Sequence, residues 1–470
     1  MGGSVPPAGP QRSAAGGGRT RFQAPRALVI AAFGAQLALV LVFWQDSARF
    51  PHARGVDEVQ MANLVAQFHR GQLAYFDPRH YPATFNPYGP LVPWLAAHAP
   101  AVIDPHIVTR LLSMGAFLCC FAMLAALLPS GRRLSLAGPA LLLALSARPI
   151  FEFVHRSKVD AIAICFALAG FILTVYGRSA RSGLAAAVAF TLAILTKTTF
   201  VAAPLAAVIS LWPRRRGRVV AVVLGWWVLS AVAVLWLQHA TAGGYLHNLR
   251  RPLTQPLKML DVGTRLLTTA PLLLIWLRAA WLAADAETRR ELRPWAIYAG
   301  LTYALGIVLA AAPGSGWNCL IECCMALALG GALLAARLDA GWLRASSGLL
   351  ALHLCFAVPY LAITQNNIMW RQRPAQTAAR LRAEAVLAPE IARGRRVAVL
   401  RNEPANDALV SLGQPTPLDV VDCMALSEPA ERALAADLLA RHEIDVIYRG
   451  RDLAPWDPTA PPGPPVVWQR

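Results

Sequence analysis

The segment GVDEVQMANLVAQFHRGQLAYFDPRHYPATFNPYGPLVPWLAAH, residues 55–98, is the longest polar interruption of the chain before its C-terminal tail. It opens with an acidic pair, Asp57-Glu58, passes through a short helical run, and ends in an aromatic and proline-rich part, Tyr75 to Trp94. A long ordered loop between hydrophobic segments usually carries function. We therefore expect the rest of the chain to be a scaffold that holds this loop in place.

The composition is that of a membrane protein. Of the 470 residues, 56% are hydrophobic and 15% are charged, and the mean hydropathy is +0.45. A soluble protein of this size would contain more charge and fewer long apolar runs. The predicted fold class is therefore mainly α, a polytopic membrane helical bundle. The net charge of +18 indicates basic loops on the inner face of the membrane, and no aromatic-interleaved basic patch points to nucleic acid.

Eleven apolar runs are candidates for membrane helices. They cover residues 27–44, 107–128, 134–150, 159–176, 183–196, 199–212, 219–238, 265–284, 295–312, 319–336 and 347–364. Residues 1–26 form a basic, Gly-, Ala- and Pro-rich arm, which predicts disorder and a cytoplasmic N-terminus. Even-numbered crossings then return to arginine-bearing loops, as the positive-inside rule requires. The high Ala and Arg content suggests a bacterial genome, so we expect a multi-pass protein of the inner (plasma) membrane.

Residues 183–212 need two crossings and not one. A single helix of this length would measure roughly 45 Å, against a hydrocarbon core of about 30 Å. It would also place the Arg178 and Arg214 loops on opposite sides of the membrane. We expect two short helices that meet at Thr196-Lys197-Thr198-Thr199.

The chain changes character after the last apolar run. The predicted membrane domain spans residues 27–365, with an extracytoplasmic loop at 45–105, and the tail spans 366–470. In the tail, an Arg-rich amphipathic stretch precedes a predicted strand at 396–400, a helix at 428–441 and a strand at 445–449, whereas the Pro-rich part at 454–465 predicts no regular structure. This alternation indicates a small extracytoplasmic α/β subdomain.

Several polar residues on the predicted outer face also have plainer explanations. Asp57-Glu58 could be a charge pair at a helix N-terminus, and Lys158 with Asp160 could be a local ion pair. Arg250 and Arg251 could be interfacial residues that extend toward water. Lys197 lies between two very short helices, where an unpaired charge is unfavourable, so we expect it to contact a phosphate or a carboxylate.

A family resemblance rests on the order of several motifs. Asp57-Glu58 follows the first helix, then come His69 to Tyr75, Tyr81-Pro82 and Asn86-Pro87-Tyr88-Gly89-Pro90. Further along are Arg156-Ser157-Lys158-Val159-Asp160, Leu195-Thr196-Lys197-Thr198, and Gly314 to Asn318 with Glu322. Over residues 27–365 the chain resembles GT-C fold membrane glycosyltransferases, the group that includes protein mannosyltransferases and lipid A aminoarabinose transferases (glycosyltransferase families 39 and 83). It departs from that pattern at Ala83-Thr84-Phe85, where many relatives carry a tighter run of prolines.

The resemblance implies an enzyme that transfers a sugar from a polyprenyl-phosphate-linked donor to an envelope glycan, lipid or protein acceptor on the extracytoplasmic face. A carboxylate would take the proton of the attacking hydroxyl. Asp57 is the candidate base, and Glu58 is the second choice or an orienting partner. Fixed cations would stabilise the lipid phosphate, and the candidates are Lys197, Arg250, Arg251, Lys258, Arg156 and Lys158. Tyr81, Asn86 and Tyr88 are expected to line the groove for the acceptor or the sugar.

Two alternatives stay open. The first is a transporter or flippase of a lipid-linked or small polar substrate. Such a protein would place charges near the bilayer midplane and often shows repeated halves, whereas here the charges gather at one edge and no repeat is visible. The second is a non-catalytic relative of the enzymes. We predict no cofactor and no metal site, because the acidic residues lack ligand spacing, with a divalent metal ion as an open alternative.

Overall fold

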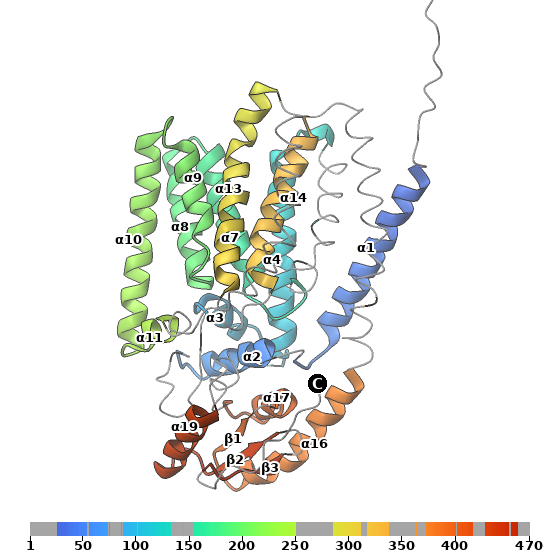
Figure 1. The fold of residues 1–470 in the computed structure, drawn as a ribbon, viewed down its shortest axis with the longest axis vertical. Coiled ribbons are helices and arrows are strands. Elements are labelled where there is room, and N and C mark those ends of the chain that lie inside the picture. The colour runs from blue at the N-terminus through green and yellow to red at the C-terminus, as the bar shows by residue number, and fades with distance from the viewer. Residues whose placement is uncertain are drawn as a thin grey trace, which may run out of the picture.

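The computed structural model describes residues 26–53, 56–73, 75, 86, 88–100, 102–132, 144, 150, 154–250, 285–311, 317–337, 363, 373–400, 402–416, 428–450 and 453–458. Figure 1 shows two parts, a bundle of upright helices and a smaller α/β unit below it. The helices α2 (Val56–His69), α3 (Leu91–Ala97) and α11 (Gly244–Arg250) lie between the two parts, across the lower ends of the bundle.

The bundle consists of apolar helices of 10 to 25 residues. They are α1 (Arg26–Arg49), α4 (Pro105–Leu127), α7 (Asp160–Tyr176), α8 (Ala180–Thr196), α9 (Ala202–Leu211), α10 (Arg216–Ala240), α13 (Ala286–Ala310) and α14 (Ile321–Ala335), with the short 3-10 helices η1 (Ser130–Arg132) and η3 (Trp317–Leu320). The helix α7 is central, because it packs against α4, α8 and α9. Its Phe171 ring lies 5.1 Å from the Trp295 ring and 4.8 Å from the Tyr298 ring of α13.

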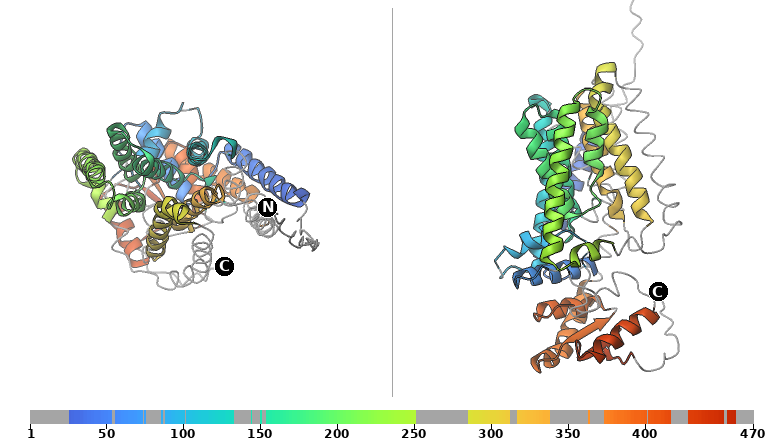
Figure 2. Two further views of the ribbon diagram at one scale, coloured as in Figure 1. Left: turned by 90° about the horizontal axis from the view of Figure 1, so that it is seen from above. Right: turned by 90° about the vertical axis from the view of Figure 1, so that its left-hand side faces the viewer.

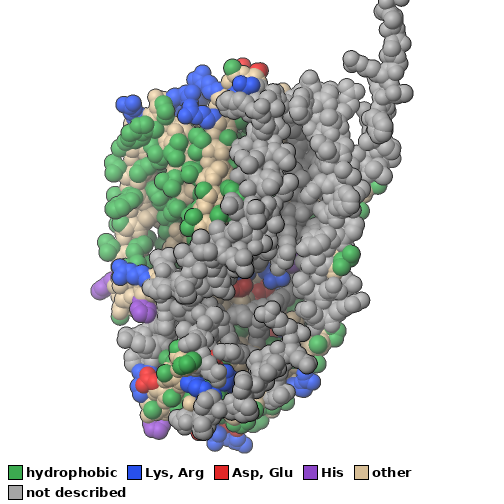
Figure 3. All heavy atoms as spheres, in the orientation of Figure 1, with side chains coloured by type: hydrophobic (Ala, Val, Ile, Leu, Met, Phe, Trp, Pro, Cys, Tyr) green, Lys and Arg blue, Asp and Glu red, His purple; other side chains and the backbone are tan. Residues whose placement is uncertain are grey.

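The outside of the bundle is apolar. On α10, Trp227 is 69% exposed and Leu235 is 67% exposed, and Figure 3 shows hydrophobic side chains covering this side of the helices. Exposed apolar surface of this extent would be unfavourable in water and suits contact with lipid. Among the described residues, α4, α10 and α13 are each long and apolar enough to cross a membrane.

The predicted helix pattern is confirmed where the structure describes it. The runs at 134–150, 265–284 and 347–364 lie largely outside the described residues. The two short helices predicted for 183–212 are α8 and α9, and Lys197 follows α8 in extended conformation. The helix α1 continues to Arg49, past residue 45, where the predicted loop begins.

The middle layer consists of α2 (Val56–His69), α3 (Leu91–Ala97) and α11 (Gly244–Arg250). Figures 1 and 2 show these helices lying across the ends of the upright helices. The helix α2 packs against α3 and α4 on one side and against α17 (Glu403–Ser411) of the tail on the other. The short helical run predicted after Asp57-Glu58 is therefore the layer that joins the two parts.

The tail is the expected α/β unit. It contains α16 (Arg373–Ala392), β1 (Val397–Leu400), α17 (Glu403–Ser411), α19 (Glu428–Ala440), β2 (Val446–Arg449) and β3 (Ala454–Pro455). The sheet order is β1-β2-β3, with β1 parallel to β2 and Val397 opposite Val446. All four β1 side chains are buried, as expected for a strand covered on both faces.

Two features of the tail differ from the sequence expectation. The helix α17 was not predicted, although Asn402 caps it by accepting a hydrogen bond from the Ala405 N–H at 3.1 Å. The Pro-rich part was expected to lack structure, but Ala454–Pro455 pairs with β2. The neighbouring Trp456 explains this, because its N–H donates to the Ile447 carbonyl at 2.8 Å and its ring packs on the core of the tail.

Candidate functional site

Glu58 lies in a buried ion pair with Arg110 of α4. The Glu58 side chain is 1% exposed and that of Arg110 is 0% exposed. Arg110 Nε donates to Glu58 Oε1 at 3.1 Å, and its Nη2 contacts Oε2. The Ser157 N–H also donates to Oε1 at 2.8 Å. Burial raises the pKa of Glu58, but the Arg110 charge and these hydrogen bonds outweigh it and hold the pKa far below its usual value.

Arg110 also fixes the end of α1. Its Nη1 donates to the carbonyls of Ser47 at 3.2 Å and Phe50 at 2.5 Å, and its Nη2 donates to the His52 carbonyl at 2.6 Å. One guanidinium therefore joins α1, α2 and α4. The orientation of α2, and with it the position of Asp57, depends on this group.

Asp57 occupies the first turn of α2 and is far more accessible than Glu58. Its side chain is 48% exposed and pairs with the Lys158 ammonium, which is 6% exposed. Burial raises the pKa of Asp57, but the charge and hydrogen bond of Lys158, together with the charge of Arg156, outweigh it, so the pKa is below its usual value. The Asp57 carboxylate is therefore ionised at neutral pH.

A second acid–base pair lies beside the first. Lys197, between α8 and α9, donates to Asp160 Oδ1 at 2.6 Å. Asp160 belongs to the first turn of α7, where the helix dipole favours a negative charge, and its side chain is 2% exposed. The predicted local pair of Lys158 with Asp160 is wrong, because Lys158 pairs with Asp57 and Asp160 pairs with Lys197. For Lys197 we expected a contact with a phosphate or a carboxylate, and its partner in the structure is the carboxylate of Asp160.

The described residues between α2 and α3 are held by hydrogen bonds to α11, to α8 and to each other. Asn86 is fully buried, its N–H donates to Asn248 Oδ1 of α11 at 3.0 Å, and its side-chain oxygen accepts from the Tyr88 N–H at 3.0 Å. The Tyr75 hydroxyl donates to the Tyr88 carbonyl at 2.8 Å. The Gly89 N–H donates to the Thr196 carbonyl at 3.0 Å. These contacts attach the predicted groove segment to α11 and to the end of α8.

The structure describes only some of the other residues that were predicted to bind the donor phosphate or to line the groove. Arg156 lies close enough to Asp57 to lower its pKa. Arg250 is exposed at the end of α11. Tyr81, Arg251 and Lys258 lie outside the described residues. Among the described residues, no three His, Cys, Asp or Glu side chains lie together as possible metal ligands.

Arg110 and His106 make central contacts in the structure but were not predicted as site residues from the sequence. Arg110 is a charge within the apolar run predicted at 107–128, and an ionisable residue in such a run is a signal of structural or functional importance. His106, one turn earlier, contacts Asp407 of the tail with 2.9 Å between Nε2 and Oδ1. That contact spans 301 residues, and no local pattern could reveal it.

Among known proteins, the chain is similar in fold to solved structures of ArnT. No family model and no curated protein matches the chain. Two crystal structures of ArnT from Cupriavidus metallidurans are similar to it. The one bound to undecaprenyl phosphate has a TM-score of 0.55 at 15% identity, over 91% of this chain and 94% of that chain. The apo structure has a TM-score of 0.53 at 16% identity, over 91% and 93% of the two chains. The predicted GT-C fold of a polytopic membrane protein is thereby confirmed.

Proposed function

We propose that this GT-C fold protein is a membrane glycosyltransferase that uses a polyprenyl-phosphate-linked sugar donor. Its acceptor would be an envelope glycan, lipid or protein. The observation that carries the proposal is the accessible carboxylate of Asp57, set among cations at the ends of the membrane helices. The ArnT structure with undecaprenyl phosphate supports the donor class, because that protein has the same fold.

The two acidic neighbours receive different roles in this proposal. Asp57 is half-exposed and ionised, so it can take a proton from an acceptor hydroxyl. Glu58 is enclosed by Arg110 and the Ser157 N–H, so no acceptor can reach it without breaking the ion pair. We assign Glu58 a positioning role, in which it holds α2 and thereby Asp57.

The transfer step follows from these positions. The acceptor oxygen attacks the anomeric carbon while the bond from that carbon to the phosphate oxygen breaks. The hydroxyl proton passes to Asp57, and the phosphate leaves on its lipid with added negative charge. Lys158 pairs with Asp57, and the charge of Arg156 acts on the same carboxylate, so these two cations would stabilise that charge. As Lys158 turns to the phosphate, it lowers the pKa of Asp57 less, which makes the carboxylate a stronger base.

The same proposal sets the orientation of the protein in the membrane. The helix α8 ends beside the loop before α3, and α10 ends beside α11. The arginine-bearing loops that precede α8 and α10 therefore lie at the end of the bundle opposite α2 and the tail (Figure 1). By the positive-inside rule those loops are cytoplasmic. Asp57, α2 and the α/β tail would then face the extracytoplasmic side, where a water-soluble acceptor meets a lipid-borne donor.

The test is transfer of radiolabelled sugar from polyprenyl-phosphate donors to total envelope material. We expect transfer by the wild type and a loss of about 10²–10⁴-fold in Asp57→Asn, which keeps the size of the side chain but removes the base. The matched control is Asp285→Asn, which changes a carboxylate that caps α13 and should leave transfer unchanged. Full activity of Asp57→Asn would refute its role as base. Absence of transfer from every donor, with substrate uptake into vesicles, would favour the transporter alternative.

A further inference from the structure

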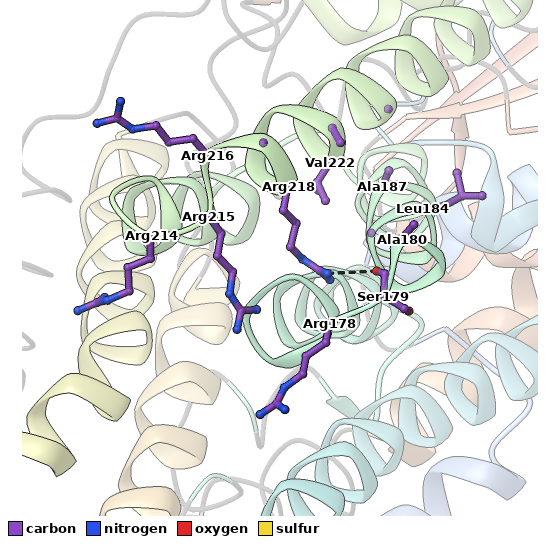
Figure 4. Close-up of a pocket in the computed structure, with 14 residues that line it drawn as sticks. Arg178, Ser179, Ala180, Leu184, Ala187, Arg214, Arg215, Arg216, Arg218 and Val222 are labelled. Carbon is purple, nitrogen blue, oxygen red and sulfur yellow. Dashed lines mark hydrogen bonds between the residues drawn. The ribbon is translucent and has the colours of Figure 1, made fainter.

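A pocket of about 920 Å³ lies between the starts of α8 and α10, far from Asp57. Figure 4 shows the five arginines that line it, Arg178, Arg214, Arg215, Arg216 and Arg218. No Asp or Glu is among its lining residues. In Figure 3, Lys and Arg side chains gather at this end of the hydrophobic helices. The pocket is therefore strongly positive and lies at the edge of the apolar surface.

Two of the arginines hold the walls of the pocket together. Arg218 Nη2 donates to the Leu173 carbonyl at 2.9 Å and to Ser182 Oγ at 2.8 Å. Arg215 Nη1 donates to the Gly177 carbonyl at 3.2 Å. These acceptors carry no formal charge, and no carboxylate of the described residues pairs with either guanidinium. The arginine frame is fixed before any ligand arrives, which reduces the entropy lost on binding.

Arg178 and Arg214 are available to a ligand. Both are exposed, and neither has a carboxylate partner within the part of the chain that the structure describes. Arg178 directly follows Gly177, the residue whose carbonyl accepts from Arg215. The Arg215 guanidinium therefore lies beside the Arg178 backbone.

The other wall of the pocket is apolar and made of small residues. On α8 it comprises Ala180, Gly183 and Ala187, and on α10 it comprises Gly217, Ala221 and Gly225. At Gly225 a Cβ would lie 3.3 Å from the Ala187 side chain, at Gly183 it would lie 3.6 Å from Val222, and at Gly217 it would meet nothing within 4 Å. The space between the two helices therefore widens toward the arginines.

We propose that this pocket binds an anionic membrane lipid, with its phosphodiester head group on the arginines and an acyl chain between α8 and α10. Guanidinium groups match phosphate oxygens in paired hydrogen bonds. Basic pockets between membrane helices on the cytoplasmic side suit such head groups. Free phosphate would satisfy the arginines but leave the apolar half of the pocket empty, where Leu184 is 64% exposed. The inference does not depend on the proposed transfer reaction.

The first experiment measures lipid retention on the purified full-length protein by native mass spectrometry. The probes are dioleoyl phosphatidylglycerol and, as the zwitterionic comparison, dioleoyl phosphatidylcholine. We expect the double variant Arg178→Gln/Arg214→Gln to weaken phosphatidylglycerol binding roughly tenfold, since each substitution removes one exposed charge contact. The matched control is Arg290→Gln/Arg293→Gln, which removes two exposed arginines of α13 outside the pocket and should change binding less than twofold.

A second variant separates a lipid from free phosphate. Ala221→Trp fills the apolar half and keeps every charge, so it should reduce phosphatidylglycerol retention while leaving binding of inorganic phosphate unchanged. Equal losses in the two double variants would overturn the proposal, because general attraction between basic loops and anionic lipid would then suffice. Retention that is equal for the two lipids, or unaffected by Ala221→Trp, would overturn it as well. Thermal unfolding of each variant shows that the fold is kept.

Discussion

His106 of α4 and Asp407 of α17 face each other across the boundary between the helical bundle and the tail. Nε2 lies 2.9 Å from Oδ1, and the two side chains are 3% and 6% exposed. The other oxygen of Asp407 accepts from the Ala53 N–H at 3.3 Å and lies 3.5 Å from Arg380 Nε of α16. One carboxylate thus connects the bundle, the end of α1 and two helices of the tail.

We predict that Asp407→Asn loosens the tail. The variant removes the charge that pairs with His106 and Arg380 but keeps the size of the side chain. Hydrogen exchange at the amides of α2 and α17 should become faster, because fewer contacts oppose local opening. The control is Asp437→Asn, whose 58% exposed carboxylate pairs with Arg441 in the next turn. Unchanged protection of α2 in Asp407→Asn would show that the ion pairs do not hold the tail.

The same contact should weaken in acid. Burial raises the pKa of Asp407, but the His106 and Arg380 cations outweigh it, so the pKa is lowered in the docked state. A group with a depressed pKa stabilises the docked state above its ordinary pKa, about 3.9, and this contribution is lost as the pH falls through the lowered value. Other titratable groups near this contact include Asp104, Glu58, His52 and Glu384. Hydrogen exchange at α17, measured from pH 7 down to pH 3 in the wild type and in Asp407→Asn, tests this prediction. The same dependence on pH in both proteins would contradict it.

Arg110→Met should destabilise the whole protein. It leaves the Glu58 carboxylate buried without its counterion, and the loss of one partner from such a pair typically costs about 3–5 kcal/mol. Three carbonyls at the end of α1 also lose their donor. Thermal unfolding in detergent measures the effect. We expect Glu58→Gln to be less harmful than Arg110→Met, because Arg110 keeps those three carbonyls as acceptors. The opposite order would show that Glu58 matters more than the frame that Arg110 builds.

Lys158→Gln should move the acidic limb of the transfer rate to higher pH. The base must be ionised, so the rate rises as the pH passes the pKa of Asp57. Lys158 lowers that pKa, whereas burial raises it. Removal of the ammonium leaves the effect of burial less opposed, and a higher pH is then needed to ionise Asp57. A pH–rate profile of both proteins with the polyprenyl-phosphate donor tests this, and an unshifted limb would exclude Asp57 as the titrating base.

Gly89→Ala should displace the loop that precedes α3. A Cβ at Gly89 would overlap the backbone carbonyl of Leu195, so the hydrogen bond from Gly89 to Thr196 could not form. We expect a lower thermal stability and a loss of transfer. Gly115→Ala in α4 is the control, because a Cβ there meets nothing within 4 Å and alanine favours a helix by up to about 1 kcal/mol over glycine. If Gly89→Ala were as stable as Gly115→Ala, the close packing of Gly89 against the Leu195 backbone would be contradicted.

The sequence predicts what depends on local patterns. Long apolar runs mark the upright helices, and the length of 183–212 requires the break at Lys197. Short runs of mostly hydrophobic residues mark β1 and β2. The sequence does not predict which charged residues pair with each other, because the pairs depend on which helix ends meet in space. Asp160 lies two residues from Lys158, yet it pairs with Lys197, since the turn before α7 directs the two side chains to different neighbours.

The break at Lys197 has a consequence for how the loop after α2 is held. A helix that continued through this point would use the Thr196 carbonyl within its own ladder of hydrogen bonds. Because α8 ends there, the carbonyl is free to accept from Gly89, and the ammonium of the next residue is free to reach Asp160. The end of a 17-residue apolar helix thus becomes the attachment point for a segment that lies more than a hundred residues earlier in the chain. An extra turn at the end of α8 would lengthen its apolar span but would remove that attachment.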